Sequence, residues 1–333
     1  MPATPDMTIT WPASLLPAPH TDFGHRLRGL WSLDPAIHFL NHGSYGAVPR
    51  HVLAAQLRWR EAMEREPVRF VAERHDLTVI EACVPWPLAG PGAIVDAYAQ
   101  AIAGGARLAI IDHVFSPLAV LTPLAEVVPL CRERGVHVLV DGAHAPGMLA
   151  LELDALGDMG VDWYVGNGHK WLFAPKGCGF IVATPEGQRN LHPVVISNYF
   201  GEGFEQEFAW SGTGDPSARL AVTAALEFIE ALGVDRYRNA LQLQACEAAQ
   251  SVAAAWGVMP GAPPEMFAGM VTLPLPVYEP ANAQTVARWR RKLLDEHRIE
   301  VPVIAIEGRL WVRISAQVYN ELSDCEALAR VFA

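Results

Sequence analysis

The sequence predicts an α/β fold with a mainly parallel β-sheet that carries helices on both faces, followed by a smaller C-terminal α+β domain. Short apolar runs alternate with segments of helical periodicity over residues 93–182, and this alternation is typical of right-handed crossovers in a parallel sheet. The run RLAIIDHV, residues 107–114, is almost continuously apolar, which indicates a strand covered on both faces. We expect an N-terminal arm over 1–37, a large domain over 38–256 and a small domain over 257–333.

Composition is that of a globular protein that binds a small molecule. The 333 residues are 51% hydrophobic and carry a formal net charge of -11, so attraction to nucleic acid or to an anionic membrane surface is not expected. The five cysteines form no C-x-x-C pair, which is typical of a reducing compartment. The N-terminus does not resemble a signal peptide, and no apolar run reaches the length of a membrane span. We expect a cytoplasmic protein without nucleic-acid or membrane partners.

The N-terminal half begins with a proline-rich leader, expected to be a loose arm, and a polar, glycine-rich turn inside HFLNHGSYGAVPR, residues 38–50. Glycines there let the backbone approach a ligand, although an ordinary surface turn explains the pattern equally well. Turn signals and periodicity then predict alternating helices and strands. We expect a helix from 51 to about 75, a strand over 77–83, a helix over 93–103, a strand over 107–114, a helix over 118–134 and a strand over 136–141.

The C-terminal half continues the alternation to residue 182 and then changes character. An irregular segment rich in aromatic residues, glycine and acids covers 198–217, and it is long enough for a loop to suggest a specific role. The arginines and lysine of 288–292 are expected on a solvated helix face. The remaining elements are a helical pattern over 216–256, strands over 270–276 and 309–316, and helices over 283–298 and 321–332.

The stretch from Val138 to Gly179 carries the candidate chemistry. One apolar run ends in Asp141, with His144 three residues later, and a second ends in a glycine-rich turn that presents Lys170. Both groups therefore fall at the carboxyl ends of strands, where ligands bind in open parallel sheets. Because an unpaired ammonium is costly to bury, a lysine at this place indicates an amine with a lowered pKa, as Schiff-base formation requires.

Four separated blocks occur in the order of a known enzyme family. They are LNHGSYGAVPR, IDHVFSP, VDGAHAPG and GNGHKWLFAPKGCGF. With these blocks the chain resembles the class V aminotransferases, which are fold-type I enzymes that use pyridoxal 5'-phosphate (PLP), and in particular their isopenicillin N epimerase-like branch. The resemblance covers the chain from about His38 to its end. It implies PLP as the cofactor, a homodimer, and a substrate that is an amino acid or a small molecule bearing one.

The resemblance also implies roles for the central residues. Lys170 would bind the cofactor as a Schiff base and, once released, would move the α-proton of the substrate. Asp141 would pair with the pyridine nitrogen and keep it protonated. His144 would lie by the ring and its phenolic oxygen, and His169 would reach the phosphate. Two simpler interpretations stand beside these: Asp141 could cap the helix after its strand, and His144 could be a satisfied core histidine.

Four further residues match the family pattern outside the central stretch. Gly212 and Thr213 resemble the segment that supplies a phosphate contact across the dimer interface, although Thr213 also fits an ordinary turn. Arg313 matches the arginine that binds the substrate α-carboxylate, a task suited to a planar, two-pronged donor. Asn41 would help to hold that carboxylate.

One part of the family pattern is missing near residues 70–80. In the family, a strand, a phosphate-binding turn with its helix N-terminus and a ring-stacking residue lie between the first helix and the strand that corresponds to LTVIEAC. Here Phe70 is followed almost directly by Leu77. A helix N-terminus binds phosphate through free N–H groups and the helix dipole, so we expect weakened cofactor affinity. Loss of a strand and its helix should also expose apolar surface, which makes the large domain incomplete.

Several functions remain open on these residues. Epimerisation, β-elimination by a carbon–sulfur lyase, and transamination all begin with loss of the α-proton, and the branch favours epimerisation. A cysteine desulfurase is less expected, because no cysteine lies in an evident glycine-rich loop. The missing segment favours a second hypothesis, a catalytically impaired protein that has lost cofactor binding. A metal hydrolase with Asp141, His144 and His169 as ligands is the weakest alternative, because it leaves Lys170 beside a cation, so we expect no metal.

Overall fold

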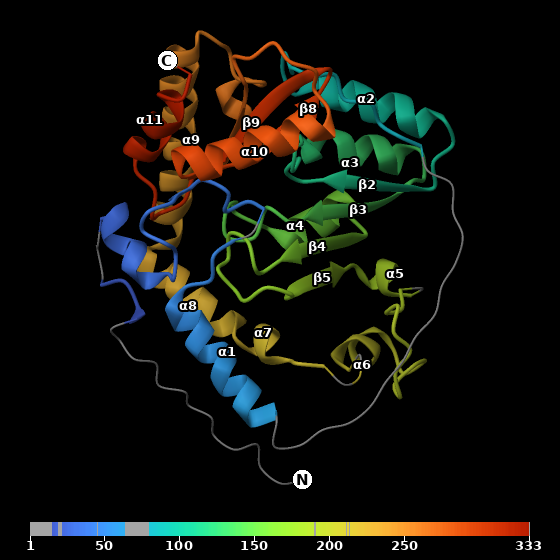
Figure 1. Ribbon diagram of the computed structural model, residues 1–333. Coiled ribbons are helices and arrows are strands. Elements are labelled where there is room, and N and C mark those ends of the chain that lie inside the picture. The colour runs from blue at the N-terminus through green and yellow to red at the C-terminus, as the bar shows by residue number, and fades with distance from the viewer. Residues whose placement is uncertain are drawn as a thin grey trace.

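The central layer of the molecule is a four-stranded sheet (Figure 1). The computed structural model describes residues 15–18, 22–44, 46–63, 80–189, 191–210, 212 and 214–332, with the side chains of 59–63 left aside. The strands of the sheet, in spatial order, are β2 (Leu108–Asp112), β3 (His137–Gly142), β4 (Trp163–Asn167) and β5 (Gly179–Ala183). The first three are parallel, and β5 is antiparallel to β4. The expected mainly parallel α/β sheet is confirmed.

One face of this sheet carries the main hydrophobic core. Ile111, Val138 and Val140 are buried there in one cluster with Ile94 and Val127 of the covering helices. Burial of such side chains supplies most of the driving force that holds the helices on the sheet. The helices of this part of the chain are α1 (Arg50–Met63), α2 (Gly92–Ala103), α3 (Leu124–Glu133), α4 (Leu153–Met159), α5 (Pro185–Gln188), α6 (Phe204–Ala209), α7 (Ser217–Leu220), α8 (Val222–Leu232) and α9 (Val234–Trp256).

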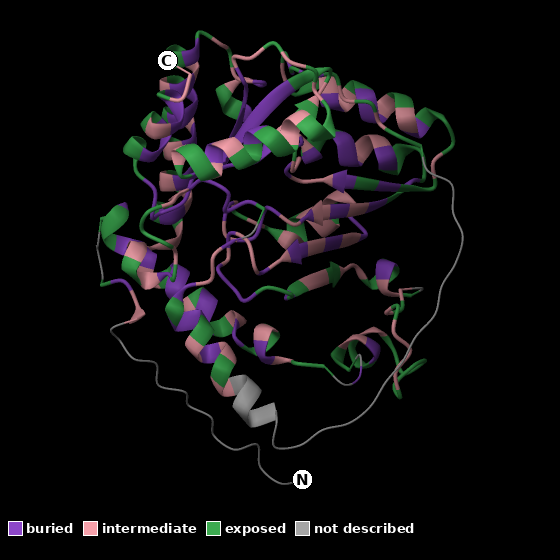
Figure 2. Ribbon diagram, in the orientation of Figure 1, coloured by how far each residue is buried: buried purple, intermediate pink, exposed green. Residues whose placement is uncertain are grey.

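The opposite face is open at strand β2 (Figure 2). Leu108 is 43% exposed and Ile110 is 63% exposed, whereas the alternate residue Ile111 is completely buried. The expectation that both faces of this strand are covered was therefore wrong. Side chains alternate between the two faces of a strand, and only one face of β2 meets the helical layer. This exposed apolar surface agrees with the expectation from the segment missing near residues 70–80, which itself lies outside the described residues.

A smaller antiparallel sheet forms the C-terminal unit. Its strands, in spatial order, are β6 (Met270–Pro274), β9 (Arg309–Ser315) and β8 (Val303–Ile306). Figure 1 shows α10 (Ala283–His297) beside β8 and α11 (Leu322–Ala329) beside α9. Asn282 begins α10 with a capping box, in which its side chain accepts hydrogen bonds from Gln284 and Thr285. The predicted small α+β unit has this composition, with β8 as an additional strand.

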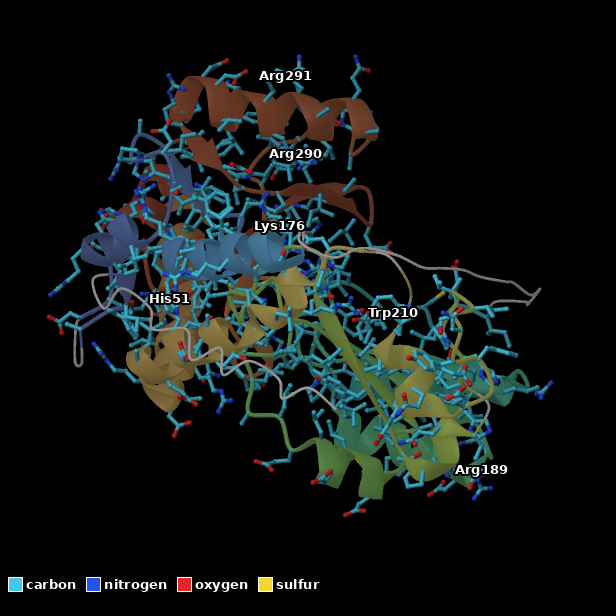
Figure 3. The ribbon with its side chains drawn as sticks, turned by 90° about the horizontal axis from the view of Figure 1, so that it is seen from below. His51, Lys176, Arg189, Trp210, Arg290 and Arg291 are labelled. Atoms are coloured by element: carbon cyan, nitrogen blue, oxygen red, sulfur yellow. The ribbon has the colours of Figure 1, made fainter. Side chains whose placement is uncertain are left out.

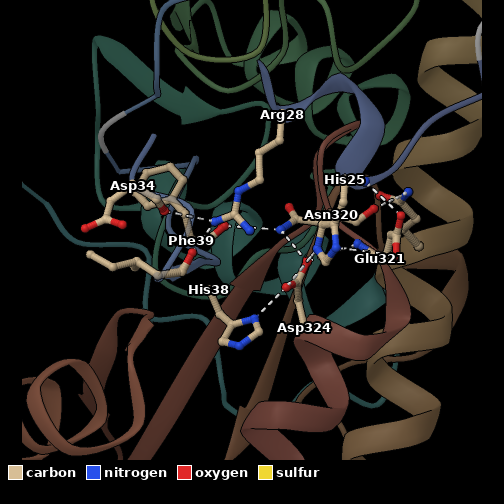
Figure 4. Close-up of polar contacts among 10 residues, drawn as sticks. His25, Arg28, Asp34, His38, Phe39, Asn320, Glu321 and Asp324 are labelled. Atoms are coloured by element: carbon tan, nitrogen blue, oxygen red, sulfur yellow. Dashed lines mark hydrogen bonds and ion pairs between the residues drawn. The ribbon is translucent and has the colours of Figure 1, made fainter. Parts of the chain in front are cut away.

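The N-terminal segment is fastened to this C-terminal unit (Figure 4). Strand β1 (His38–Phe39) pairs in parallel with β7 (Ile299–Glu300). The buried carboxylate of Asp324 accepts hydrogen bonds from His38 Nδ1 at 2.6 Å and His25 Nε2 at 3.1 Å. A short 3-10 helix, η2 (His25–Leu30), precedes the buried Trp31. The N-terminal arm is thus packed from residue 22 to residue 37, and the part of the leader before residue 15 lies outside the described residues.

Several predicted boundaries were wrong for local reasons. The helical pattern over 216–256 is divided into α7, α8 and α9, because Gly233 separates the last two with a left-handed φ of 81°. The helix expected over 118–134 begins only at Leu124, after Ala119 with φ 60°. The irregular segment 198–217 contains helix α6. Residues 80–83 of the strand expected over 77–83 are not in a strand, and 77–79 lie outside the described residues.

The basic cluster of α10 is a solvated helix face, as expected. Arg288, Arg290 and Arg291 are exposed, and Trp289 between them is buried. In Figure 3, Arg290 and Arg291 lie at one end of the molecule and Arg189 lies at the other. Over the described part of the chain, no helix combines the length and the apolar character that crossing a membrane requires.

Candidate active site

Asp141 and the turn that bears Lys170 lie at the carboxyl ends of two neighbouring strands. Asp141 is aligned with Val165 in the register of β3 and β4, and Lys170 follows the end of β4. The Asp141 carboxylate accepts a hydrogen bond from the Ala143 amide at 2.8 Å. The next helix, α4, begins only at Leu153, so the interpretation of Asp141 as a helix cap was wrong. Its carboxylate instead shapes a tight turn and remains partly exposed.

Lys170 contacts His144 directly. The distance between Lys170 Nζ and His144 Nε2 is 3.0 Å. Burial lowers the pKa of Lys170, and the positive charge of Arg313 lowers it further, whereas Asp141 raises it. Burial holds the pKa of His144 well below its usual value, and a positive charge on Lys170 would lower it further. The amine therefore lies in surroundings that favour its neutral, nucleophilic form.

Trp171 occupies the other nitrogen of the same imidazole. Its indole Nε1–H donates to His144 Nδ1 at 3.2 Å, and both side chains are buried. His144 is thus a buried histidine with both ring nitrogens engaged, as the core interpretation held, but one of its contacts is the candidate catalytic amine. Neither nitrogen is left to bind a metal, and the described residues contain no group of three His, Cys, Asp or Glu side chains placed to hold one.

Arg313 is held at the site by two serines from distant parts of the chain. Its Nη1 donates to the Ser116 carbonyl at 2.5 Å and to the Ser116 hydroxyl at 3.1 Å, and its Nη2 donates to the Ser44 hydroxyl at 2.8 Å. Burial lowers the pKa of Arg313 to about 10, so the guanidinium is charged at neutral pH. Ser116 Oγ also lies 3.2 Å from His144 Nε2, which links Arg313 to the Lys170 site.

Buried polar atoms on and next to β9 lack partners among the described residues. The Arg313 Nε and the Asn41 Oδ1 atoms are buried without a hydrogen bond to the described residues. Asn41 lies next to β9 through a bridge to Ser315. Because a buried polar group without a partner is costly, these atoms point to a ligand with hydrogen-bonding groups. The predicted pairing of Asn41 with Arg313 around a carboxylate agrees with this arrangement and stays a prediction.

The backbone of Lys170 is fixed from the N-terminal segment. His42 Nε2–H donates to the Lys170 carbonyl at 3.0 Å, and the Tyr319 hydroxyl donates to His42 Nδ1 at 2.6 Å. Complete burial lowers the pKa of His42 to about 4, so the ring is neutral. A Cβ atom on Gly46 would lie 2.7 Å from the His169 carbonyl. The glycine in the N-terminal turn is therefore required for its close approach to the lysine turn.

The residues assigned to the phosphate are less well connected. His169 Nδ1 donates to the Cys178 carbonyl at 3.3 Å, within its own turn. Gly212 is buried with φ 97°, and Thr213 lies outside the described residues, as do the positions 70–79 of the missing segment. Helix α3 follows β2 and helix α4 follows β3, but neither helix begins directly at the end of its strand. Neither β2 nor β3 is therefore followed directly by a helix N-terminus.

A cavity opens beside Asp141. It has a volume of about 400 Å³ and is lined by residues at the ends of β3, β4 and β5, namely Asp141, Ala143, Val165, Gly166, Asn167, Gly179, Phe180 and Ile181. Its volume is in the range of small-molecule sites. Asp112 is aligned with Asp141 in the neighbouring strand, and burial together with the charge of Asp141 raises the pKa of Asp112.

Sequence reasoning missed the residues that support the reactive groups. Ser44, Ser116, His42 and Trp171 lie inside the quoted motif blocks, which was the available signal. Several of their contacts, however, join positions more than 100 residues apart. His42 contacts Lys170 across 128 residues, and Arg313 contacts Ser116 across 197. Tyr319 gave no signal.

Known proteins resemble this chain in sequence and in architecture. The family model described as Aminotransferase class-V matches residues 69–328. A probable chloroplastic L-cysteine desulfhydrase of Arabidopsis thaliana is 35% identical over 271 residues, which cover 75% of this chain and 56% of the relative. The isopenicillin N epimerase of Amycolatopsis lactamdurans is 31% identical over 293 residues, with 83% and 70% covered. The chain spans between 56% and 61% of the length of four plant relatives.

A solved structure shows the same fold. The apo cysteine desulfurase of Thermococcus onnurineus NA1 has a TM-score of 0.67 to this chain, at 16% sequence identity, over 94% of this chain and 98% of the other. At this identity the likeness establishes the architecture and not the reaction. It agrees with the fold-type I arrangement expected from the sequence.

The residues present fit the reactive end of PLP. Lys170 supplies an amine whose pKa is lowered, Asp141 supplies a carboxylate at the rim of a cavity of about 400 Å³, and Arg313 presents an unpartnered Nε. A carboxylate and an amine of this kind match the ring nitrogen and the aldehyde of the cofactor. Of the residues that the sequence assigned to the phosphate, His169 and Gly212 lie in the described part of the chain.

Proposed function

Because the chain belongs to the aminotransferase class-V family of PLP enzymes, we propose that it removes the α-proton of an amino-acid substrate with Lys170 and cleaves a carbon–sulfur bond. The observation that carries this proposal is the contact of 3.0 Å between Lys170 Nζ and His144 Nε2 in a buried place that lowers the pKa of the amine. A general base must be largely unprotonated near neutral pH to accept a proton. The burial that lowers the pKa of Lys170 favours the unprotonated form that this role needs.

The other site residues have complementary tasks. When bound, PLP withdraws electrons from the Cα–H bond of the substrate. Asp141 holds a proton on the pyridine nitrogen, and His144 donates from Nε2 next to the amine. Arg313, fixed by Ser44 and Ser116, binds the α-carboxylate and orients the substrate. His169, Gly212 and Thr213 are the proposed phosphate contacts, the last two across a dimer interface.

Carbon–sulfur cleavage agrees better with the described geometry than epimerisation. An epimerase needs a second acid or base on the opposite side of Cα, whereas β-elimination needs one base. Lys170 and His144 are hydrogen-bonded to each other and so lie on one side of the site. Relatives named L-cysteine desulfhydrase, at 33% to 36% identity, support the same choice. The products from L-cysteine and water would be sulfide, pyruvate and ammonia.

Isopenicillin N epimerase-like activity is the second candidate. The blocks LNHGSYGAVPR and GNGHKWLFAPKGCGF carry that resemblance, and the epimerase of Amycolatopsis lactamdurans covers 83% of the chain. Transamination would begin with the same proton removal. The missing segment supports a further alternative, a family member with impaired PLP binding.

The test uses the purified full chain with added PLP. We expect a visible absorption band that is absent in Lys170→Ala, and release of sulfide and pyruvate from L-cysteine that falls at least about 10³-fold in that variant. Lys176→Ala, six residues away on the exposed side of the same loop, is the matched control and should keep both signals. Exchange of the α-proton in D₂O with formation of the D-amino acid, without sulfide, would instead establish the epimerase. Absence of the band at saturating PLP would exclude both.

A homodimer and a cytoplasmic location complete the proposal. The neighbouring helices α1, α7 and α8 expose large apolar side chains, namely Leu53, Leu57, Leu220 and Leu226, and such surfaces often mark interfaces. We expect a dimer in light scattering and a monomer for Leu57→Glu, whereas Leu243→Glu on α9 should remain dimeric. All five cysteines are free, which supports a reducing compartment.

A further inference from the structure

The side chain of Trp171 makes one polar contact, to His144, and that contact determines which proton His144 carries. The indole Nε1–H is a donor only, and it points at His144 Nδ1 from 3.2 Å. His144 Nδ1 must therefore be the acceptor. In a neutral imidazole the single proton then lies on Nε2, the nitrogen that faces Lys170 Nζ at 3.0 Å and Ser116 Oγ at 3.2 Å.

The protonation state of Lys170 follows from this arrangement. An Nε2–H group can donate to Lys170 only if the amine is neutral and offers its lone pair. A Lys170 ammonium would need Nε2 as an acceptor, but Nδ1 already accepts from Trp171, and a neutral imidazole has only one acceptor nitrogen. The charged lysine thus loses its hydrogen bond to His144 as long as Trp171 stays in place.

We propose that Trp171 is a positioning residue that locks His144 in the Nε2–H tautomer and thereby keeps the Lys170 amine unprotonated and directed at the imidazole. This proposal deepens the proposed function, because the neutral amine is the form that reacts with PLP and accepts the α-proton. Trp171 acts only through His144. No contact between the indole and the substrate or cofactor is required.

The surroundings hold Trp171 rigidly enough for this task. Its side chain is completely buried, and its carbonyl accepts a hydrogen bond from the Tyr237 hydroxyl at 2.8 Å. The preceding carbonyl, that of Lys170, is bonded to His42. The dipeptide of Lys170 and Trp171 is therefore fixed at two backbone carbonyls from separate elements, so the indole N–H has little freedom to leave His144.

Other charged groups near the amine do not explain why His144 carries its proton on Nε2. Asp141 and Asp112 raise the pKa of Lys170, and Arg313 lowers it. Around His144, burial lowers the pKa most, the charge of Arg313 opposes protonation further, and a charge on Lys170 or His169 would act in the same direction. These effects favour a neutral His144, but none of them distinguishes its two tautomers. Trp171 and Ser116 are the described groups bonded to it besides Lys170, and the Ser116 hydroxyl can either donate or accept.

The lysine content of the chain allows a direct test on the cofactor-free protein. The sequence contains three lysines, Lys170, Lys176 and Lys292. Amine labelling with a small electrophile, followed by mass spectrometry of peptides, reads each one separately, and Lys176 serves as an internal standard. In Trp171→Phe we expect labelling of Lys170 near neutral pH to slow about three- to tenfold, from the loss of one hydrogen bond. The pH at which half of the amine reacts should rise.

A control variant distinguishes loss of the Trp171–His144 hydrogen bond from general loosening of the core. Trp256→Phe removes a buried indole hydrogen bond to the Ala329 carbonyl, far from Lys170 in the sequence, and should leave the Lys170 labelling curve in place. Tyr237→Phe removes the hydrogen bond that holds the Trp171 carbonyl and should shift the curve by less than Trp171→Phe does. If Trp256→Phe shifts the curve as far as Trp171→Phe does, or if Trp171→Phe leaves it unchanged, the proposal is wrong.

Nitrogen-15 NMR of the histidine rings gives an independent readout. The His144 signals, identified by their loss in His144→Gln, should show the Nε2–H tautomer in the parent protein and a mixture of tautomers in Trp171→Phe. A parent spectrum with the Nδ1–H tautomer would overturn the proposal. Neither measurement needs PLP or turnover. Failure of the proposed carbon–sulfur lyase activity would thus be seen separately, in the sulfide assay.

Discussion

The carboxyl ends of β3 and β4 and the outer strand β2 belong to one sheet but differ sharply in how they are completed. At the first place, His144 is buried, Lys170 is half-buried and the two are hydrogen-bonded, with support from segments far away in the sequence. At the second, Leu108 and Ile110 leave apolar side chains in solvent. The groups that carry chemistry are thus built in detail, while the cover of the sheet next to them is incomplete.

This difference separates the reactivity of the lysine amine from the binding of the cofactor phosphate, two properties that usually occur together. The reactive amine depends on contacts made within the described residues, and these are present. Firm seating of the cofactor phosphate depends on a helix N-terminus, and neither β2 nor β3 is followed directly by one. The chain should therefore show the chemistry of a PLP enzyme with an unusually weak dependence on the phosphate.

Substitutions on the two faces of β2 should give the largest difference in the free energy of unfolding. Ile111→Ala should lower the free energy of unfolding by about 2–5 kcal/mol, because it leaves a cavity in the core. Ile110→Ala, one residue earlier on the open face, should change it by less than about 0.5 kcal/mol. Urea denaturation of both variants measures this. Equal losses would mean that the open face is covered in solution, for example by a second copy of the chain.

Around Lys170, the buried His42 should make the free energy of unfolding depend on pH. The pKa of His42 is about 4 in the folded protein and about 6.5 in the unfolded chain. Between these values the unfolded state binds more protons, so the free energy of unfolding falls as the pH falls from 6.5 to 4, by up to about 3 kcal/mol from this residue. His42→Gln should flatten this part of the stability curve, and His297→Gln on α10 should not. An unchanged slope in His42→Gln would show that folding does not lower the pKa of His42.

Arg313 should matter through its two-pronged geometry. Arg313→Lys keeps a charge but cannot bond Ser44 and Ser116 together with a carboxylate, so we expect the KM for the amino acid to rise about 10- to 100-fold. Steady-state kinetics measures this, with Arg309→Lys on the exposed part of the same strand as the control. A lower kcat with an unchanged KM would assign Arg313 to the reaction step and not to carboxylate binding.

The smallest expected effect concerns the phosphate. Calorimetry with 4-deoxypyridoxine and its phosphate, which lack the reactive aldehyde, isolates the contribution of that group. Without a helix N-terminus the two dissociation constants should agree within about tenfold, or ~1.4 kcal/mol. A phosphate form that binds more than a hundredfold tighter would show that residues outside the described ranges complete the cradle.

Much of the fold could be predicted because its signals are local. Apolar runs ending in Asp141 and before Lys170 placed both residues at strand ends, and the structure aligns β3 and β4 in parallel there. Boundaries failed where one residue's backbone decided them, as at Gly233 and Ala119. The apolar run of β2 predicted burial on both faces, but hydrophobicity cannot report whether a covering element exists.

The sequence by itself determined which groups can react and in what order along the chain they appear, because strand ends and motif spacing are properties of short segments. Only the tertiary structure decided how those groups are tuned. His42, Ser44, Ser116 and Tyr319 reach the site from segments that no local pattern connects, and the direction of one indole N–H, that of Trp171, selects the proton that His144 presents to Lys170. Hydrogen-bond partners of this kind exist only once the chain has folded, since burial removes the water that would otherwise satisfy each group.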